Sequence, residues 1–363
     1  MTDADHRTQR LLKGLDLPDQ VSDVLKKSRY HNLAFCLAFL ERCHEIRRCD
    51  PQAGLIVSRA ATSLAQKIPK KECGGLQSWC SLQVHALVVA ANAQRSVSDF
   101  SGAEATCQIA QFLYLDEADP LAHADLLQSL LYLRRDQRRF DQAERYASRA
   151  IEIYKELRHH HLWGCALVDR GVLAIRSNQP FKAATDLFEA MSLIDRQQSP
   201  AYYYLAAHNL AVALADDRES NPIEALYWLR YAQQINEEPE SSFSQIKLLW
   251  AEGRILEKQG MLSEAEHFLQ TVRLRLLEHR TLSDYALASL DLAGVYLKQS
   301  RNQDVRTLAA ELLPIFQQLR TDRDAVAGLR LFHRRAITEA LSLEVLSSIK
   351  RVLRARARPM MRS

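Results

Sequence analysis

Small and apolar residues recur along this chain in a fixed spacing. One set of three positions, at i, i+4 and i+7, repeats at steps of 40 or 41 residues. This spacing places the three members on one face of an α-helix. A constant period of this length is typical of solenoids, in which each unit buries its apolar face against the next. The six sets are Ala103/Cys107/Ala110, Ala143/Ala147/Ala150, Ala184/Phe188/Met191, Ala225/Leu229/Ala232, Ala265/Leu269/Val272 and the degenerate Val305/Ala309/Leu312.

Each set follows a second amphipathic stretch, so the repeating unit is a pair of helices. The clearest pair spans residues 245–275, with Gly253 in its first helix, Gly260 in the turn, and Ala265 in its second helix. Small residues at facing positions predict close approach of two backbones, and a glycine permits the turn between them. Asp50-Pro51 has the N-cap and first-turn residues of a helix start. We therefore expect an all-α, right-handed α-solenoid of antiparallel helix pairs.

The two ends of the chain depart from the period. A terminal unit of a stacked array has one face without a neighbour, so its sequence differs from that of the inner units. We expect residues 1–75 to form a divergent N-terminal helical cap and residues 76–320 to form the repeat array. Residues 321–363 are expected to form a C-terminal helical cap and a basic tail that frays from Lys350 onward.

Composition agrees with a folded helical protein of the cytoplasm. Of the 363 residues, 47% are hydrophobic and 25% are charged, and the net charge of +4 is too small to indicate a polyanionic partner. The first twenty residues lack the apolar segment of a secretion signal, and no apolar run approaches the roughly 18 residues of a membrane span. The seven cysteines form no C-x-x-C pair. We expect them to be reduced and mostly buried, and we expect no contact with a membrane.

The repeat resembles a known family. Gly253, Gly260, Ala265 and Leu269 follow the order of small and apolar residues in tetratricopeptide repeats, and Phe140 with Ala143 and Ala150 does the same. The resemblance covers about residues 80–320. Its period is longer than the usual 34 residues and is similar to that of long-helix variants in bacterial peptide-sensing regulators. The resemblance implies the fold, and it implies no reaction.

Signatures of enzymes and metal sites are missing. The chain contains no glycine-rich phosphate loop, no H-E-x-x-H and no G-x-S-x-G motif. The consecutive His159, His160 and His161 point in different directions, so they cannot all reach one ion. We expect them in a solvated junction between two units. The chain is therefore predicted to be non-enzymatic, with no cofactor and no bound metal.

Two basic clusters have alternative interpretations. In the run Arg134, Arg135, Arg138 and Arg139, residues four apart are expected to share a helix face. This edge either binds an acidic peptide or phosphate, or is a solvated helix end that pairs with Asp136, Asp141 or Glu144, and we favour the second interpretation. The C-terminal basic residues have no interleaved aromatic side chain for base stacking, so a nucleic-acid partner is disfavoured. They are Lys350, Arg351, Arg354, Arg356, Arg358 and Arg362.

The favoured binding surface is the concave face of the superhelix, which the first helices of the pairs line. A groove of this kind binds an extended or helical segment of a partner. Trp250 either anchors such a partner or packs in the core. The main alternative is a ligand-sensing regulatory protein that acts on a transcriptional or enzymatic partner. Both hypotheses require a face that the chain's own segments leave open. The expected face residues are Tyr132, Arg135, Arg176, His208, Lys247, Trp250, Arg254 and Lys298, with Asn209 and Asp291 at its edge or just below it.

Overall fold

A computed structural model describes residues 21, 25–114, 119–216, 221–235, 243–318, 323–338 and 340–356 of the chain. Every regular element in these ranges is a helix, which confirms the all-α prediction. None of these helices is both long and apolar enough to cross a bilayer. The chain divides into two compact units, with the boundary between His160 and His161. The three-part division at residues 75 and 320 stays a prediction.

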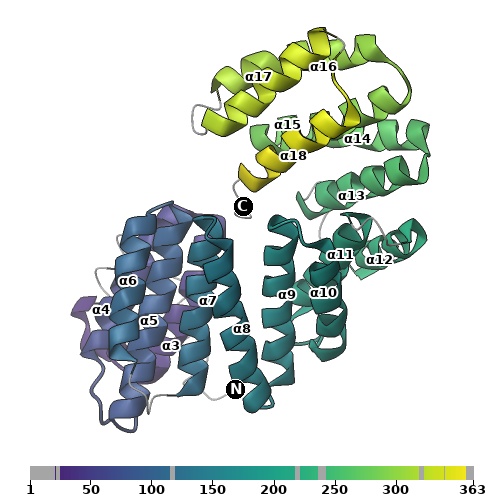
Figure 1. Cartoon of the computed structure of the whole chain (residues 1–363). Helices are drawn as coiled ribbons and strands as arrows, with labels where there is room; N and C mark the ends of the chain where they lie inside the picture. The colour runs from purple at the N-terminus through teal and green to yellow at the C-terminus, as the bar shows by residue number, and fades with distance from the viewer. Residues whose placement is uncertain are drawn as a thin grey trace. The chain divides into compact units, whose positions relative to one another are not determined.

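Unit 1 is a stack of antiparallel helix pairs. Consecutive helices pack against each other, and the first helices of successive pairs also make contact, α3 with α5 and α5 with α7 (Figure 1). Six of the seven cysteines of the chain lie buried, and only Cys49 is exposed, as expected. The elements are η1 (Ser28–Tyr30), α3 (Leu33–Cys49), α4 (Pro51–Lys67), α5 (Leu76–Ser96), α6 (Phe100–Leu113), α7 (Pro120–Asp136) and α8 (Phe140–Glu156).

Unit 2 continues the same arrangement of paired helices. The first helices α11, α13 and α15 contact one another in succession, and the last helix, α18, packs against both α17 and α15. We refer to the first helices that stack in this way within a unit as its first-helix layer. The elements are α9 (His160–Arg176), α10 (Pro180–Leu193), α11 (Pro200–Asp216), α12 (Pro222–Ile235), α13 (Phe243–Gln259), α14 (Leu262–Glu278), α15 (Leu282–Lys298), α16 (Asn302–Gln318), α17 (Arg323–Ile337) and α18 (Leu343–Arg356).

The tight turns between helices share one backbone motif. Two residues before the next helix begins, a residue adopts a left-handed conformation, as at Arg138 (φ 64°), Asn178 (φ 60°), Gly260 (φ 79°) and Ser300 (φ 59°). The N–H of the following residue then bonds back across the turn, for example from Arg139 to the carbonyl of Arg134 at 2.8 Å. This is the Schellman arrangement that ends many helices. Glycine fills the left-handed position at Gly260, but other turns of this kind use arginine, asparagine or serine.

The second helices keep one register throughout the array. They begin at residues 100, 140, 180, 222, 262 and 302, and a buried small or apolar residue follows three positions later in each case. In α10 the buried apolar residues are Ala183, Leu187 and Ala190, so the predicted set Ala184/Phe188/Met191 is wrong by one position. The side chain of Phe188 is 62% exposed and meets the edge of Trp228. The prediction assigned Phe188 to the buried face of α10 because it is a large aromatic residue, whereas Leu187 occupies that face.

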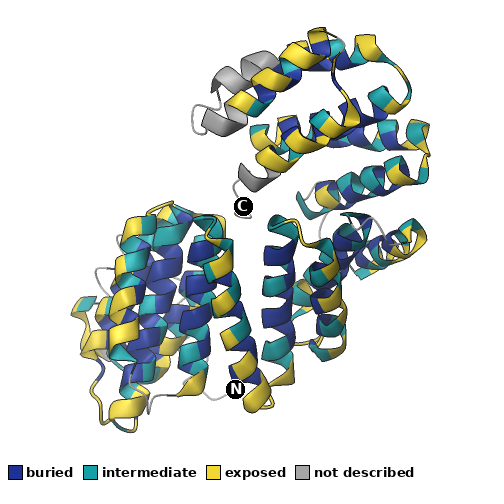
Figure 2. Ribbon diagram, viewed as in Figure 1, coloured by how far each residue is buried: buried dark blue, intermediate teal, exposed yellow. Residues whose placement is uncertain are grey.

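Helix α15 forms the centre of the C-terminal core. All residues from Tyr285 to Tyr296 are buried, because α13, α14, α16 and α18 surround this helix (Figure 2). A helix that is buried all round belongs to a protein interior. Leu346, Ile349 and Leu353 of α18 join the same core cluster. The expected fraying is therefore wrong for residues 350–356, which are helical, whereas residues 357–363 lie outside the described part of the chain.

The corrected register of α10 predicts opposite effects for two adjacent substitutions. Leu187 is fully buried, and its side chain fills the space beside Gly171 of α9. Leu187→Ala should lower the free energy of unfolding by about 2–5 kcal/mol. Phe188→Ala should lower it by about 1 kcal/mol or less, because most of that ring faces solvent. Urea unfolding followed by circular dichroism measures both, and a larger loss at Phe188 would contradict the register.

Candidate partner-binding face

The residues predicted for the binding face all lie on first helices, but they belong to two units. Tyr132 and Arg135 lie on α7 of unit 1. The others belong to unit 2, where contacts among α11, α13 and α15 form one layer. These are Arg176 on α9, His208 and Asn209 on α11, Lys247, Trp250 and Arg254 on α13, and Asp291 and Lys298 on α15.

A buried carboxylate organises the first-helix layer of unit 2. Asp291 is 1% exposed and accepts a hydrogen bond from the indole Nε1–H of Trp250 at 2.9 Å. The ammonium of Lys350 donates to the other carboxylate oxygen, also at 2.9 Å. The guanidinium of Arg254 lies 3.9 Å from Asp291. Burial of a charge requires such partners, since water no longer solvates it. Trp250 thus packs against the core and holds Asp291.

Further ion pairs connect the same helices. Arg254 of α13 pairs with Asp216, the last residue of α11. One turn further along α13, Glu257 pairs with Lys298 of α15, with 3.2 Å between Nζ and Oε1. The predicted set included Arg254 and Lys298 but missed their partners Asp216 and Glu257. Both carboxylates lie near the ends of first helices, and this position in the sequence could have identified them as partners of the basic residues.

Helix α18 covers part of this layer, so the expectation of an entirely open face is wrong at α15. Lys350 of α18 binds one carboxylate oxygen of Asp291, and Trp250 binds the other. An added Cβ at Gly294 would lie 3.2 Å from Glu257 of α13 and 3.5 Å from Leu346 of α18, so both helices pack over this position of α15. In Figure 1, α18 accordingly lies beside α15. The spacing of Leu346, Ile349 and Leu353 indicates one apolar helix face, and this signal could have identified α18 as a packed element.

The remaining predicted residues of unit 2 lie on neighbouring parts of the layer. His208 is buried and stacks on Tyr204, with 5.9 Å between ring centroids. Asn209 is partly exposed and donates to the carbonyl oxygen of Leu205 in its own helix at 2.8 Å. Lys247 is exposed, with its ammonium 4.8 Å from the centroid of Phe243. Burial raises the pKa of nearby Asp284, and Lys247 opposes this effect. Arg176, at the end of α9, is partly exposed.

The arginine run of unit 1 does not form the predicted helix edge. Helix α7 ends at Asp136, and Arg138 adopts a left-handed turn conformation, so the four arginines do not share a helix face. Arg134 is buried instead and binds Glu104 of α6 through two hydrogen bonds, of 2.6 and 2.7 Å. These bonds lower the pKa of Glu104 to about 2. The predicted pairing is confirmed for Arg135, which binds Asp136, whereas the prediction of a solvated Arg134 that pairs with Asp136, Asp141 or Glu144 is wrong, because Arg134 is buried against Glu104.

The three consecutive histidines are divided between a turn and a helix. Helix α9 begins at His160. The ring of His161 lies 3.1 Å from the hydroxyl of Ser199 and accepts the N–H of Asp195 at 3.1 Å. His161 therefore joins the start of α9 to the turn before α11, rather than projecting into a solvated junction.

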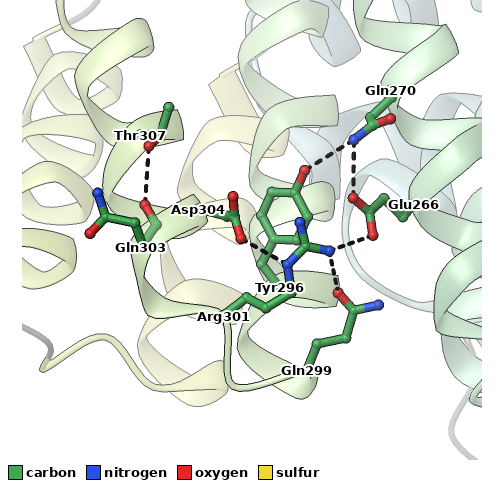
Figure 3. Close-up of polar contacts among 8 residues, drawn as sticks. All are labelled: Glu266, Gln270, Tyr296, Gln299, Arg301, Gln303, Asp304 and Thr307. Carbon is green, nitrogen blue, oxygen red and sulfur yellow. Dashed lines mark hydrogen bonds and ion pairs between the residues drawn. The ribbon is translucent and has the colours of Figure 1, made fainter.

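A pocket of about 400 Å³ lies between α14, α15 and α16. Figure 3 shows Arg301 beside the ring of Tyr296 and between Glu266 and Asp304, which it binds at 2.7 Å each. The pocket is lined by tyrosine and leucine side chains and by an equal number of polar or charged ones, Gln270, Arg273, Asp304, Thr307 and Glu311. No site was predicted here from the sequence. Tyr285 and Tyr296 are 11 residues apart, about three helical turns, so their shared face was the available signal.

Substitution of Lys350 tests whether α18 is held by the buried carboxylate. Lys350→Met should lower the free energy of unfolding by about 1–3 kcal/mol, because Asp291 loses a charged partner. In the Asp291→Asn background the same substitution should have a much smaller effect, since the two residues act as a pair. Arg351→Met is the matched control, because Arg351 is the exposed neighbour of Lys350. Equal effects in both backgrounds would contradict the pairing.

The Glu104–Arg134 pair predicts a pH dependence of stability. The pKa of Glu104 in the folded chain is below its ordinary value of 4.5, so the unfolded chain takes up the proton first as the pH falls. The pair therefore stabilises the fold fully above about pH 5, and this contribution is lost as the pH falls toward 2. The stability difference between the parent and Glu104→Gln should shrink over that range. Glu152→Gln, in an exposed pair, serves as control.

Comparisons with known proteins identify the fold. No protein-family model matches the chain, and no curated protein matches its sequence. The structure is similar to that of a Rap protein complexed with Competence and Sporulation Factor, with a TM-score of 0.65 and 13% identity over 89% of this chain and 88% of that chain. It is also similar to the apo form of RapI, with a TM-score of 0.50 and 14% identity over 74% of this chain and 99% of that chain. The chain therefore has the tetratricopeptide-like helical-repeat fold that its sequence predicted.

Proposed function

We propose that the chain is a non-enzymatic scaffold or sensor that binds a peptide or a segment of a partner protein on the first-helix layer of unit 2. The observation that carries this proposal is the way α18 lies on that layer. Its apolar residues Leu346 and Ile349 pack into the core, while Lys350 reaches the buried Asp291. An amphipathic helix on a receptive face is a common mode of segment recognition. The layer thus already accommodates one helical segment of defined chemistry.

The surface that we assign to the partner comprises α11 and the first half of α13, together with Arg176 at the end of α9. Three of the predicted residues there are partly or fully exposed: Arg176, Asn209 and Lys247. They offer a guanidinium, an amide and an ammonium group, which recognise backbone carbonyl and carboxylate groups of a bound segment. The core packing of α13 and α15 holds the layer rigid behind them.

The structural neighbours agree with this proposal at the level of the fold. The Rap protein named above holds Competence and Sporulation Factor as a bound partner. A stack of helix pairs, in which each pair contacts only its neighbours, suits such binding because it presents a long continuous surface. We extend the binding role of this fold to the present chain.

A regulatory output is the second candidate, and the Lys350–Asp291 contact favours it. Lys350 retains 17% exposure of its side chain, so a competing cation from a partner segment has access to the edge of this pair. A partner that binds the layer better when α18 is displaced shifts the population of chains toward that state. The displaced helix then signals occupancy to a transcriptional or enzymatic partner.

Site-specific photo-crosslinking in cells tests the proposed face. A photoreactive phenylalanine analogue replaces Asn209 or Lys247 on first helices, and matched controls replace the exposed Phe188 on α10 or Tyr227 on α12. We expect the first two positions to form crosslinks to one defined segment, identified by mass spectrometry, and the controls to form none to it. Crosslinks to that segment from all four positions, or from the control positions alone, would contradict the proposal.

A further inference from the structure

Three arginines converge at the ends of the first helices of unit 1. Arg47 lies near the end of α3, Arg95 near the end of α5, and Arg135 near the end of α7. The carboxylate of Asp136 contacts Arg95 and Arg135, and Arg47 lies near enough to Arg95 for their charges to repel. Helices α3, α5 and α7 contact one another in succession, so these side chains belong to one layer.

Asp136 orients two of the three guanidinium groups. Arg95 pairs with one of its oxygens, and the Nε–H of Arg135 donates to the other at 3.2 Å. Both guanidinium groups also lie against the ring of Tyr132, at 5.5 and 5.1 Å from its centroid. Each guanidinium has five N–H donors in a fixed plane, and these contacts use only some of them. The carboxylate and the ring thus fix the planes of the two groups.

Arg47 has only weak and neutral partners in the described part of the chain. Its Nη1 lies 3.5 Å from the hydroxyl of Ser96, and its Nη2 lies 3.5 Å from the ring of His44. Burial and the neighbouring Arg47 lower the pKa of His44 to about 4, so this ring is neutral at pH 7. The stem of Arg47 is held firmly, since a Cβ at Gly54 of α4 would lie 2.6 Å from its Cα.

The pKa of Arg47 indicates that its positive charge has no carboxylate partner among the residues that the structure describes. Burial and repulsion from Arg95 lower its pKa to about 10, and no carboxylate is among the groups that shift it. Cations at helix C-termini are favourable in general. That effect accounts for one arginine at the end of each helix, but not for the proximity of Arg47 to the Arg95–Asp136–Arg135 group.

The charges in the cluster do not balance. Arg95 and Arg135 share the carboxylate of Asp136, while Arg47 beside Arg95 pairs with no carboxylate in the described part of the chain, so the three guanidinium groups exceed this carboxylate by two positive charges. The side chains of Arg95 and Arg135 are 11% and 13% exposed, so water screens their charges only weakly. We propose that Arg47, Arg95 and Arg135 form a binding site for a doubly charged oxyanion group, either one phosphoryl group or two neighbouring carboxylates. Guanidinium groups bind both through paired N–H donors.

This site is independent of the function proposed above, because it lies entirely in unit 1. Its failure would leave the segment-binding face of unit 2 untouched, and the reverse also holds. The two proposals also use different readouts, since one concerns crosslinks from α11 and α13 and the other concerns anion affinity.

Isothermal titration calorimetry on the full chain, at constant ionic strength, tests the site with four probes. These are inorganic phosphate and three short Gly-Ser peptides that carry one phosphoserine, two adjacent glutamates or two adjacent glutamines. We expect at least one of the anionic probes to bind and the glutamine peptide not to bind. Binding of free phosphate indicates a small-ion site, whereas binding of the charged peptides alone indicates a site for a partner segment.

Arginine variants connect the binding to the cluster. Arg47→Gln should weaken it at least about tenfold, because a charge-assisted pair is lost. Arg47→Lys keeps the positive charge but loses the paired N–H donors of the guanidinium group, so this variant should bind with intermediate affinity. Arg149→Gln, in an exposed ion pair on α8, is the matched control and should bind like the parent. Circular dichroism verifies that each variant is folded, and Arg135→Gln replaces Arg47→Gln if the latter is not. Absence of binding by every anionic probe, or unchanged affinity in the folded arginine variant, overturns the proposal.

Discussion

The structure depends on close approach of helix backbones at small residues. Three positions after the start of each second helix, residues such as Ala143, Ala183 and Ala265 are completely buried. Alanine and glycine at these contacts bring the two helices of a pair together, so that larger residues such as Leu187 and Leu269 fill the space beside Gly171 and Gly253. Native cores tolerate few voids and little overpacking. A repeated contact of this kind therefore sets the period of the whole array.

Buried carboxylates form the second level of organisation. Asp291 in unit 2 and Asp136 in unit 1 each lie in a first-helix layer, and each joins basic side chains from more than one helix. Asp186 of α10 similarly binds Arg170 of α9 through two hydrogen bonds, of 2.7 and 2.8 Å. An ion pair inside a protein contributes little net stability relative to a well-packed apolar pair, but removal of one partner is costly. These carboxylates therefore select which helices meet and in which register.

The two layers use this chemistry in different ways. In unit 2 the chain supplies its own cation, Lys350, so Asp291 is neutralised and α18 becomes part of the face. In unit 1 the balance is reversed, because arginines outnumber the carboxylate that they share. One fold thus presents a partly filled acidic centre and a positively charged one. A scaffold with two such surfaces has the means to distinguish partners by charge as well as by shape.

Much of the fold follows from the sequence. The 40-residue period, the helix pairs and the helix start at Asp50-Pro51 are local patterns, and the structure confirms them. The local pattern failed in α10, where Phe188 and Leu187 are both plausible core residues. Only the presence of Gly171 opposite Leu187 decides between them. Likewise, the arginine run has the composition of a basic edge, and only the helix end at Asp136 separates its members.

The sequence by itself determined the class of fold, the repeat and the helices on which the candidate residues lie. The tertiary structure decided which charges meet. Asp291 and Lys350 are 59 residues apart, and Arg47 and Ser96 are 49 residues apart, so no local pattern reports their contact. The physical reason is that helix periodicity is a property of neighbouring residues, whereas a buried charge depends on partners from distant segments that packing brings within hydrogen-bond distance.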